Sequence, residues 1–303
     1  MRYRSADEDS GRWVGFPFRD GDIVISTRSK SGTTWVQMIC ALLVFQTPDL
    51  PAPLVELSPW LDWLGTPREE AMARLEAQDH RRFVKTHTPL DGLSLDPRAT
   101  YLVVARHPLD MAVSLHHQGD NLDRERIARL TGQASPTRST PHPSRQDWLM
   151  AWIDTDADPR DRMDSLPGVL HHLSDAWSRR HEPNVVLVHY DDLVADREGV
   201  MRGLAATLGI TVPDERWPVL AEAAGFGAMR RRAGQLAPDA GGILKDRTAF
   251  FRRGSSGAGR EALSNGEWDR YLARAAELAP PDLLAWLHRD DDVLALSYDD
   301  GHG

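Results

Sequence analysis

The chain has 303 residues, of which 41% are hydrophobic and 27% charged, and its formal net charge is −9. This composition is typical of a globular protein with one large domain or two small ones. The acidic balance argues against general nucleic-acid binding, which needs a basic face, so we expect no nucleic-acid partner.

Three further features bear on where the protein works. No apolar run approaches the roughly 20 residues needed to cross a bilayer, so we expect no transmembrane segment. The N-terminal residues 1–10 are charged and lack the apolar stretch of a signal peptide. The single cysteine, Cys40, excludes an intramolecular disulfide and lies among apolar residues, as an inert core thiol does. We therefore expect a cytoplasmic protein.

The first expected strand leads into a polar turn and a helix. Residues 23–25 are β-branched, as in a strand buried on both faces of a parallel sheet. Small and hydroxyl-bearing residues follow, up to the expected helix start at Thr34. A helix N-terminus presents unpaired N–H groups and a partial positive charge, which favour a bound phosphate or sulfate. Lys30 adds a full charge, so this segment is predicted to bind an anion.

This segment differs from the Walker A loop, in which the lysine follows the second glycine. Here Lys30 precedes Gly32 by two residues, and no glycine opens the turn. The order weakens a kinase or ATPase interpretation but leaves phosphate binding intact. A capped helix with a merely solvated lysine remains the alternative for this segment taken alone.

Three more strands are expected, and each ends in polar residues that suit a binding site. The carboxyl ends of parallel strands meet at one edge of the sheet, where ligands bind in open α/β folds. We therefore expect these polar residues to come together. The strands are residues 82–85, 101–105 and 185–189, followed by Lys85–His87, Arg106–Pro108 and Tyr190–Asp192.

Helical patterns alternate with these strands, which predicts an α/β fold with a central parallel sheet. Residues 119–165 interrupt the alternation with many charges and little periodicity, so we expect an insertion or substrate lid there. The end of the chain, after about Leu296, is expected to fray. The expected helices are residues 34–45, 68–80, 110–117, 166–180 and 198–208.

Four sequence blocks, in this order, resemble the cytosolic-type sulfotransferases, which use 3′-phosphoadenosine 5′-phosphosulfate (PAPS). They are TRSKSGTTW at 27–35, KTHTPL at 85–90, RHPLDMAVS at 106–114 and FFRRG at 250–254. Residues 80–93 and 280–286 resemble the actinobacterial branch that includes mycobacterial glycolipid sulfotransferases. The resemblance implies a single P-loop-like α/β domain over residues 1–303. It also implies transfer of the sulfuryl group of PAPS to an alcohol or phenol, with release of 3′,5′-bisphosphoadenosine (PAP).

The resemblance also implies roles for individual residues. Lys30 would lie near the oxygen that bridges phosphorus and sulfur, where charge develops as the sulfuryl group leaves. The predicted 5′-phosphate ligands are Ser31, Gly32, Thr33 and Thr34. The predicted 3′-phosphate ligands are Arg106 and Ser114, with Arg252, Arg253 and Gly254 in a loop that closes over the same phosphate. The predicted adenine contacts are Trp35, Tyr190, Phe226 and Met229.

His87 is the predicted catalytic base. A hydroxyl acceptor must lose its proton as it attacks sulfur, and histidine titrates near neutral pH. Lys85 is predicted to stabilise charge on the transferring group. The pairs His116–His117 and His171–His172 lack the partners that would complete a metal site, so no metal is predicted.

Two departures from the family pattern affect these expectations. Gly259 stands where the family's closing loop has tryptophan, which predicts a looser loop. The turn begins Thr27–Arg28–Ser29, where tyrosine and proline are usual. Residues 260–271 lack the threonine-valine pattern by which vertebrate members dimerise, so the oligomeric state stays open.

The acceptor is the least determined part of the prediction. We expect Trp60, Trp63, Trp148 and Trp152 to contribute to an apolar pocket for a small-molecule, lipid or carrier-bound hydroxyl compound. Two alternatives remain for the whole protein. One is an NTP-dependent kinase with Asp191 and Asp192 binding metal, and the other is a catalytically impaired nucleotide-binding module.

Overall fold

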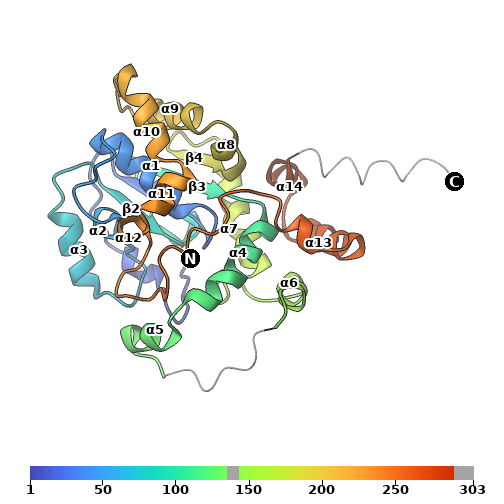
Figure 1. Ribbon diagram of the computed structural model, residues 1–303. Coiled ribbons are helices and arrows are strands. Elements are labelled where there is room, and N and C mark those ends of the chain that lie inside the picture. Colours follow the sequence, from blue (N-terminus) through green and yellow to red (C-terminus); the bar gives the residue numbers. More distant parts are fainter. Residues whose placement is uncertain (135–142, 290–303) are drawn as a thin grey trace.

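A four-stranded parallel sheet lies at the centre of the fold (Figure 1). The computed structural model describes residues 1–134 and 143–289. The strands lie in the order β2-β1-β3-β4, and every neighbouring pair is parallel. In the register of the sheet, Ile25 of β1 lies between Lys85 of β2 and Leu102 of β3. The strands are β1 (Ile23–Ser26), β2 (Phe83–Thr86), β3 (Thr100–Ala105) and β4 (Val185–His189).

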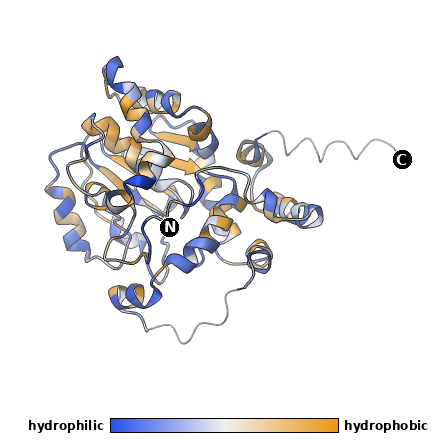
Figure 2. Ribbon diagram, in the orientation of Figure 1, coloured by the Kyte–Doolittle hydropathy of each residue, from blue (hydrophilic) through white to orange (hydrophobic). Residues whose placement is uncertain are grey.

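Helices cover both faces of the sheet, and alternate strand residues enter two separate cores. Ile23 and Ile25 of β1 pack on one face, whereas Val24 packs on the other. Figure 2 shows the apolar strands in the middle of the molecule and the polar sides of the helices turned outward. This burial on both faces explains the continuous apolar runs of the strands.

The first core lies under the helices that follow β1 and β4. They are α1 (Thr33–Phe45), α2 (Leu54–Leu57), α8 (Tyr190–Ala195), α9 (Arg197–Thr207), α10 (Trp217–Ala223), α11 (Phe226–Arg231) and α12 (Ala233–Leu236). The second core lies under helices from several parts of the chain. They are α3 (Arg68–Glu76), α4 (Pro108–Asn121), α6 (Arg145–Ile153), α7 (Leu166–Ser178), α13 (Asn265–Leu278) and α14 (Pro281–His288).

The prediction of an α/β fold with a central parallel sheet is confirmed, and so are its four strands. Helix boundaries differ in places. The helix expected at 110–117 is longer, because Pro108 occupies its first turn and His107 caps it by accepting a hydrogen bond from the Leu109 N–H. The helix expected at 68–80 ends at Glu76.

The segment at 119–165 is more helical than its weak periodicity indicated. It contains the end of α4, the helix α5 (Arg124–Thr131) and α6. Side-chain caps hold both new helices, since Asp123 accepts from the Arg126 N–H and Ser144 accepts from the Asp147 N–H. The tail expected to fray after Leu296 lies outside the described residues. Within the described ranges, no helix is long and apolar enough to span a membrane.

Candidate active site

The turn between β1 and α1 exposes the N-terminus of that helix. Lys30 has a φ of 67° and Gly32 a φ of 111°, so the chain curls back on itself before the first helical residue. A Cβ atom at Gly32 would lie 3.1 Å from Cδ2 of Tyr190, so glycine suits both the backbone and the space. Gly32 caps α1 without a side-chain hydrogen bond, which leaves the first N–H groups available to an anion.

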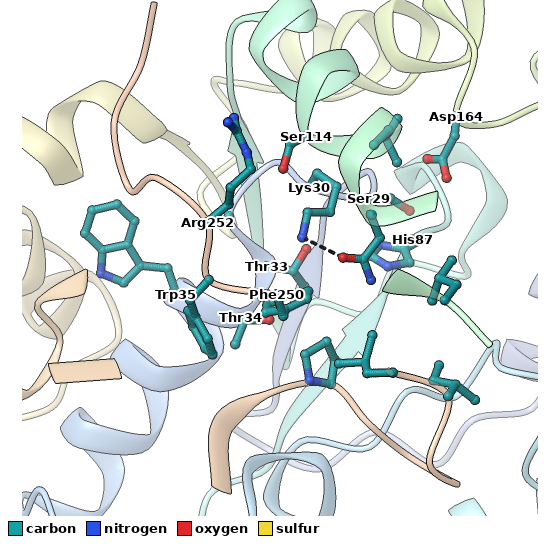
Figure 3. A pocket seen from close by; sticks show the side chains of 18 of the residues that line it. Ser29, Lys30, Thr33, Thr34, Trp35, His87, Ser114, Asp164, Phe250 and Arg252 are labelled. Atoms are coloured by element: carbon teal, nitrogen blue, oxygen red, sulfur yellow. Dashed lines mark hydrogen bonds between the residues drawn. The ribbon is translucent and has the colours of Figure 1, made fainter. Parts of the chain in front are cut away.

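This helix terminus opens into a cavity of about 330 Å³ at the carboxyl edge of the sheet. Its lining includes residues that lie at or within a few positions after the carboxyl ends of all four strands. Figure 3 shows Arg252 and Trp35 on one side of Lys30, and His87 and Asp164 on the other. Among the residues that line the cavity are Ser29, Lys30, Gly32, Thr33, Thr34, Trp35, Lys85, His87, Arg106, Ser114, Tyr190, Phe226, Met229, Arg252, Arg253 and Gly254.

Lys30 is the cation at the centre of the cavity. Its Nζ atom lies 3.7 Å from the centre of the Phe250 ring and 3.4 Å from Oε1 of Gln118. Burial, together with the positive charges of Arg106 and Arg252, lowers the pKa of Lys30 to about 7. An anion bound here would reverse this shift, since it would stabilise the charged lysine.

Arg106 is held beside Lys30 with part of its guanidinium unsatisfied. It donates hydrogen bonds to the carbonyl oxygens of Lys30 at 3.3 Å and Ser255 at 3.0 Å, and it stacks on the Tyr190 ring at 4.3 Å. Its Nε atom is buried and has no hydrogen-bond partner among the described residues. A buried donor in this state fits an anionic ligand, because it is otherwise left desolvated and unpaired.

The loop after Phe250 is tied to α4 and to the start of α8. The Asp110 carboxylate accepts from the N–H groups of Gly257 at 2.9 Å and Gly259 at 2.7 Å. Ser256 donates to Asp191. A Cβ atom at Gly259 would lie 2.4 Å from Cβ of Leu109, so this backbone path has no room for a tryptophan. These bonds hold the loop in place although it lacks the family's tryptophan, whose absence led us to predict a looser loop.

His87 directly follows β2, and hydrogen bonds fix its orientation. Its Nδ1 atom contacts the carbonyl oxygen of Thr27. A carbonyl can only accept, so Nδ1 carries the proton and Nε2 keeps a free lone pair. The pKa of His87 lies well below its usual value, chiefly because the ring is buried and also because Lys85 and Arg28 are close. The ring is therefore neutral near pH 7, as a proton acceptor must be.

Two groups support the chain around His87. Asp62 accepts hydrogen bonds from the His87 N–H at 3.1 Å and from the Thr86 hydroxyl. The Trp60 ring meets the imidazole edge to face, with ring centres 4.7 Å apart. The Lys85 ammonium lies 3.7 Å from the Trp60 ring centre, and burial lowers its pKa to about 8.

Comparison with known proteins identifies the family. A profile of the sulfotransferase domain matches residues 20–273. The chain belongs to the sulfotransferase family. A glycolipid sulfotransferase of Mycobacterium bovis is 44% identical over 305 residues, covering 94% of this chain and 93% of the relative. A glycolipid sulfotransferase of Mycobacterium tuberculosis is 43% identical over 304 residues, with the same shares covered.

Solved structures show that the sulfotransferase fold is shared with distant proteins. A retinol dehydratase crystallised with retinol and PAP has a TM-score of 0.68 at 20% identity, covering 88% of this chain and 84% of that one. A mouse sulfotransferase crystallised with PAP has a TM-score of 0.63 at 18% identity, covering 94% and 90%. The predicted P-loop-like fold of this sulfotransferase is confirmed.

The predicted reaction class is also confirmed: this sulfotransferase is an enzyme that moves the sulfuryl group of PAPS to a hydroxyl acceptor. The comparisons therefore decide against the kinase and the impaired binding module. The structure agrees for the kinase, since Asp191 accepts from Ser256 and Asp192 pairs with Arg289 at 2.6 Å. Neither aspartate lines the cavity.

The structure gathers the predicted site residues of the sulfotransferase around one cavity with one exception, Ser31, and Arg253 differs from the rest in being paired already. Ser31 is buried behind the turn, where its N–H donates to the Arg28 carbonyl, and it does not line the cavity. Arg253 does line it, but its guanidinium makes two hydrogen bonds to Glu261, at 2.8 and 2.9 Å.

The tryptophan prediction is half wrong. Trp60 and Trp63 line the cavity, whereas Trp148 and Trp152 do not. These two lie on α6 and pack in the second core, and the Trp152 N–H donates to the Asp164 carbonyl. Sequence alone did not separate them, because an indole in a core and one in a pocket leave the same apolar signal.

The sequence analysis missed several polar groups of the cavity. They are Asp7, Glu8, Gln118 and Asp164, together with the buried Arg28 behind them. The first two come from the charged N-terminal segment, which looked like solvated surface. Only Arg28 left a signal, as a departure from the family's usual turn sequence.

Proposed function

We propose that this enzyme sulfates a hydroxyl of a glycolipid, with His87 as the general base and Lys30 and Lys85 as the cations that stabilise developing charge. The observation that supports this proposal most directly is the orientation of His87. Its Nδ1–H is held by the Thr27 carbonyl, and it lines the same cavity as both lysines.

The cavity suits a nucleotide that carries two separate anionic groups. The N-terminus of α1 with Lys30, Thr33 and Thr34 would hold the 5′-phosphosulfate, through N–H groups, hydroxyls and one ammonium. Arg106 and Ser114, with Arg252 and Gly254 from the loop, would hold the 3′-phosphate, and Arg253 would have the smaller part because Glu261 already binds it. Ser31 would contribute only by shaping the turn, since it does not line the cavity and its N–H is already donated to the Arg28 carbonyl.

Four apolar side chains would bind the adenine ring. The Tyr190 ring links this set to the 3′-phosphate site, because it stacks on Arg106. It also meets Trp35 edge to face, with ring centres 5.2 Å apart. The planar faces of these rings suit a flat base. The four residues are Trp35, Tyr190, Phe226 and Met229.

PAPS supplies the sulfuryl group that is transferred. Nε2 of His87 takes the acceptor hydroxyl's proton as the acceptor oxygen bonds to sulfur. The bond between sulfur and the bridging oxygen breaks at the same time, and Lys30 stabilises the charge that this oxygen gains. Lys85, held against Trp60, stabilises the charge on the transferring group.

The acceptor class rests on the relatives and on the lining of the cavity. The two mycobacterial relatives are described as glycolipid sulfotransferases. Trp60 and Trp63 supply apolar surface beside His87. Arg124 and Ile127 of α5 also line the cavity, which supports a role for residues 119–165 as its cover within one domain. The cytoplasmic location stays a prediction, testable by cell fractionation.

Transfer from radiolabelled PAPS tests the proposal. The purified enzyme is incubated with a lipid extract of its source organism, separated into glycolipid and non-glycolipid fractions. We expect label to enter the glycolipid fraction with the unaltered chain and not with His87→Ala. Labelling confined to the other fraction would contradict the acceptor class, and labelling by both proteins would contradict the base assignment.

A further inference from the structure

The cavity has an acidic side that the sulfuryl-transfer chemistry does not use. Glu8 and Asp164 line it, and we refer to these two residues as the acidic pair. In Figure 3, Asp164 lies beside His87, across Lys30 from Arg252. An anionic nucleotide belongs with Lys30 and Arg252, so the acidic pair lies on the acceptor side of the reacting group.

Of the acidic pair, Glu8 is the residue whose carboxyl group has the fewer hydrogen-bond partners. The residue is 8% exposed, and its Oε2 atom has no hydrogen-bond partner in the described part of the chain. The nearest cation is the Arg28 guanidinium, 3.9 Å away. Burial raises the pKa of Glu8 to about 8, so near neutral pH its carboxyl group can both donate and accept hydrogen bonds.

The position of Glu8 is fixed by the backbone on either side of it. Glu8 forms a bridge with Trp63, and the Asp9 N–H donates to the Asp62 carbonyl at 3.0 Å. The Leu64 N–H donates to the Asp7 carbonyl at 2.9 Å. The fold therefore holds a poorly paired carboxyl group at the cavity wall, where a structural residue would be paired or apolar.

Arg28 joins the acidic pair to the catalytic histidine. Its guanidinium is 2.7 Å from the Asp164 carboxylate, donates to the His87 carbonyl and faces Glu8. Arg28 is buried, and it stands in the turn where the family's usual sequence is absent. Two carboxyl groups and the base are thus held in one fixed arrangement.

Aromatic surface adjoins this arrangement. The rings of Trp60 and Trp63 are stacked, with centres 5.1 Å apart, and both residues line the cavity. The Trp60 ring is stacked on Trp63 and contacts the Lys85 ammonium, so its remaining exposed part supplies the apolar surface on which C–H groups of a sugar can pack while the sugar's hydroxyls bond to carboxyl oxygens. A simple alcohol would leave Glu8 unpaired, and an acidic sugar would meet like charge at Asp164.

We propose that Glu8 is a specificity-determining residue that, with Asp164, binds hydroxyls of a neutral sugar ring whose neighbouring hydroxyl faces His87. The proposal deepens the proposed function and rests on its assignment of the acceptor side. On this proposal the enzyme recognises the sugar of the acceptor rather than its lipid.

Three probes with the same tail test this selectivity: hexyl β-glucoside, hexyl β-glucuronide and 1-hexanol. Binding to the PAP-loaded full chain is followed by tryptophan fluorescence, and transfer is followed with labelled PAPS. We expect the glucoside to bind and react at least about tenfold better than the other two. In Glu8→Ala the KM for the glucoside rises about tenfold or more, since a hydrogen bond is lost, and the preference over hexanol shrinks. Glu8→Gln should retain part of the preference.

The controls separate this proposal from the proposed function. Glu215→Gln removes an exposed carboxylate far along the chain and should change neither binding nor preference. If no probe is sulfated but glucoside binding still depends on Glu8, the proposed function fails and the sugar site stands. If the unaltered chain does not bind the glucoside, or if Glu8→Ala affects the glucoside and hexanol equally while the thermal midpoint is retained, the sugar site is overturned.

Discussion

Nδ1–H of His87 donates a hydrogen bond to the main-chain carbonyl of Thr27, which belongs to the turn that also carries Lys30. The base and the charge-stabilising lysine are thus positioned by one segment. β1 and β2 are adjacent and parallel, with Ser26 opposite Thr86, so the residues that follow them meet at the same level of the sheet. The orientation of the base is therefore a direct consequence of sheet register.

Removing the imidazole should abolish chemistry and spare nucleotide binding. We expect His87→Ala to lower kcat by about 10²- to 10⁴-fold, the usual contribution of a general base, with the Kd for PAP changed less than about threefold. Single-turnover transfer and calorimetric titration measure the two quantities. His181→Ala, at an exposed histidine, is the matched control. A variant that loses PAP affinity as much as rate would mean that His87 serves the nucleotide instead.

The same histidine sets the acid limb of the pH profile. Burial and the neighbouring Lys85 and Arg28 hold the pKa of His87 well below its usual value. The ring must be neutral to accept a proton, so the rate should stay level as the pH falls through 6.5 and decline only at more acidic values. A plot of kcat against pH tests this. A decline centred at pH 6.5 would mean that the working base is a solvated histidine.

Nucleotide binding should be linked to proton uptake through Lys30. In the free protein, burial and the nearby arginines lower its pKa to about 7, so at pH 8 much of it is neutral. A bound anion raises the pKa again, and each PAP should take up a fraction of a proton at pH 8 and almost none at pH 6. Calorimetry in two buffers of different ionisation enthalpy measures the uptake.

A charge-fixed variant isolates the contribution of Lys30 to this linkage. Lys30→Arg is always protonated, so the uptake at pH 8 should largely disappear. Lys85 has a pKa lowered to about 8 and lines the same cavity, so Lys85→Arg serves as the comparison and should keep most of the uptake. Uptake that vanishes in Lys85→Arg and persists in Lys30→Arg would transfer the role to Lys85.

Most of the sheet could be predicted from the sequence because its strands are buried on both faces. That burial produces short unbroken apolar runs in the strands, such as Tyr101–Ala105. The carboxyl ends of parallel strands must share an edge, so the grouping of Lys30, His87 and Arg106 also followed. Helices such as α6 could not be predicted from the sequence, because α6 is stabilised by its cap and by packing on α4 and α13.

The acceptor side could not be predicted, for a different reason. Glu8 lies about eighty residues from His87 in a segment whose charges look like solvated surface. The bridge to Trp63 and the backbone hydrogen bonds beside it bring Glu8 to the cavity. Trp152 shows the opposite error, since it packs in the second core. Long-range pairing of this kind leaves no periodicity in the sequence.

Arg106 should discriminate between nucleotides with and without a 3′-phosphate. Its Nε is buried and unpaired among the described residues, which suits a phosphate oxygen. We expect Arg106→Ala to weaken PAP binding by about 10- to 100-fold and binding of 5′-AMP by less than about threefold. Titration of the unaltered chain and of Arg106→Ala with both nucleotides measures this difference, and the exposed Arg98→Ala is the control. Equal losses for PAP and 5′-AMP would place Arg106 elsewhere on the nucleotide.

The two arginines of the closing loop should differ in importance. Arg253 is already held by two hydrogen bonds to Glu261, whereas Arg252 lies close enough to Arg106 for their charges to interact. We expect Arg252→Ala to reduce PAP affinity about tenfold and Arg253→Ala to reduce it by less than about threefold. Direct titration of both variants is sufficient. A larger loss in Arg253→Ala would show that the Glu261 pair breaks when the nucleotide binds.

Glu8 should lower the stability of the fold that it serves. Its carboxyl group is buried without a hydrogen-bond partner among the described residues, and its pKa is raised from 4.5 to about 8. The unfolded chain ionises Glu8 near pH 4.5 and the folded chain does not. The contribution of Glu8 to the free energy of unfolding is therefore fully present below pH 4.5, and it is lost as the pH rises toward about 8. Glu8→Gln removes this loss.

The variant should consequently be more stable than the unaltered chain at pH 8, by something on the order of a few kcal/mol, and equally stable near pH 4. Urea unfolding at both pH values measures the difference. A residue retained for packing would give the opposite sign, because its replacement would weaken the fold at every pH. A stability gain at pH 8 together with lost sugar preference would mark Glu8 as a binding residue that the fold retains at the expense of its own stability.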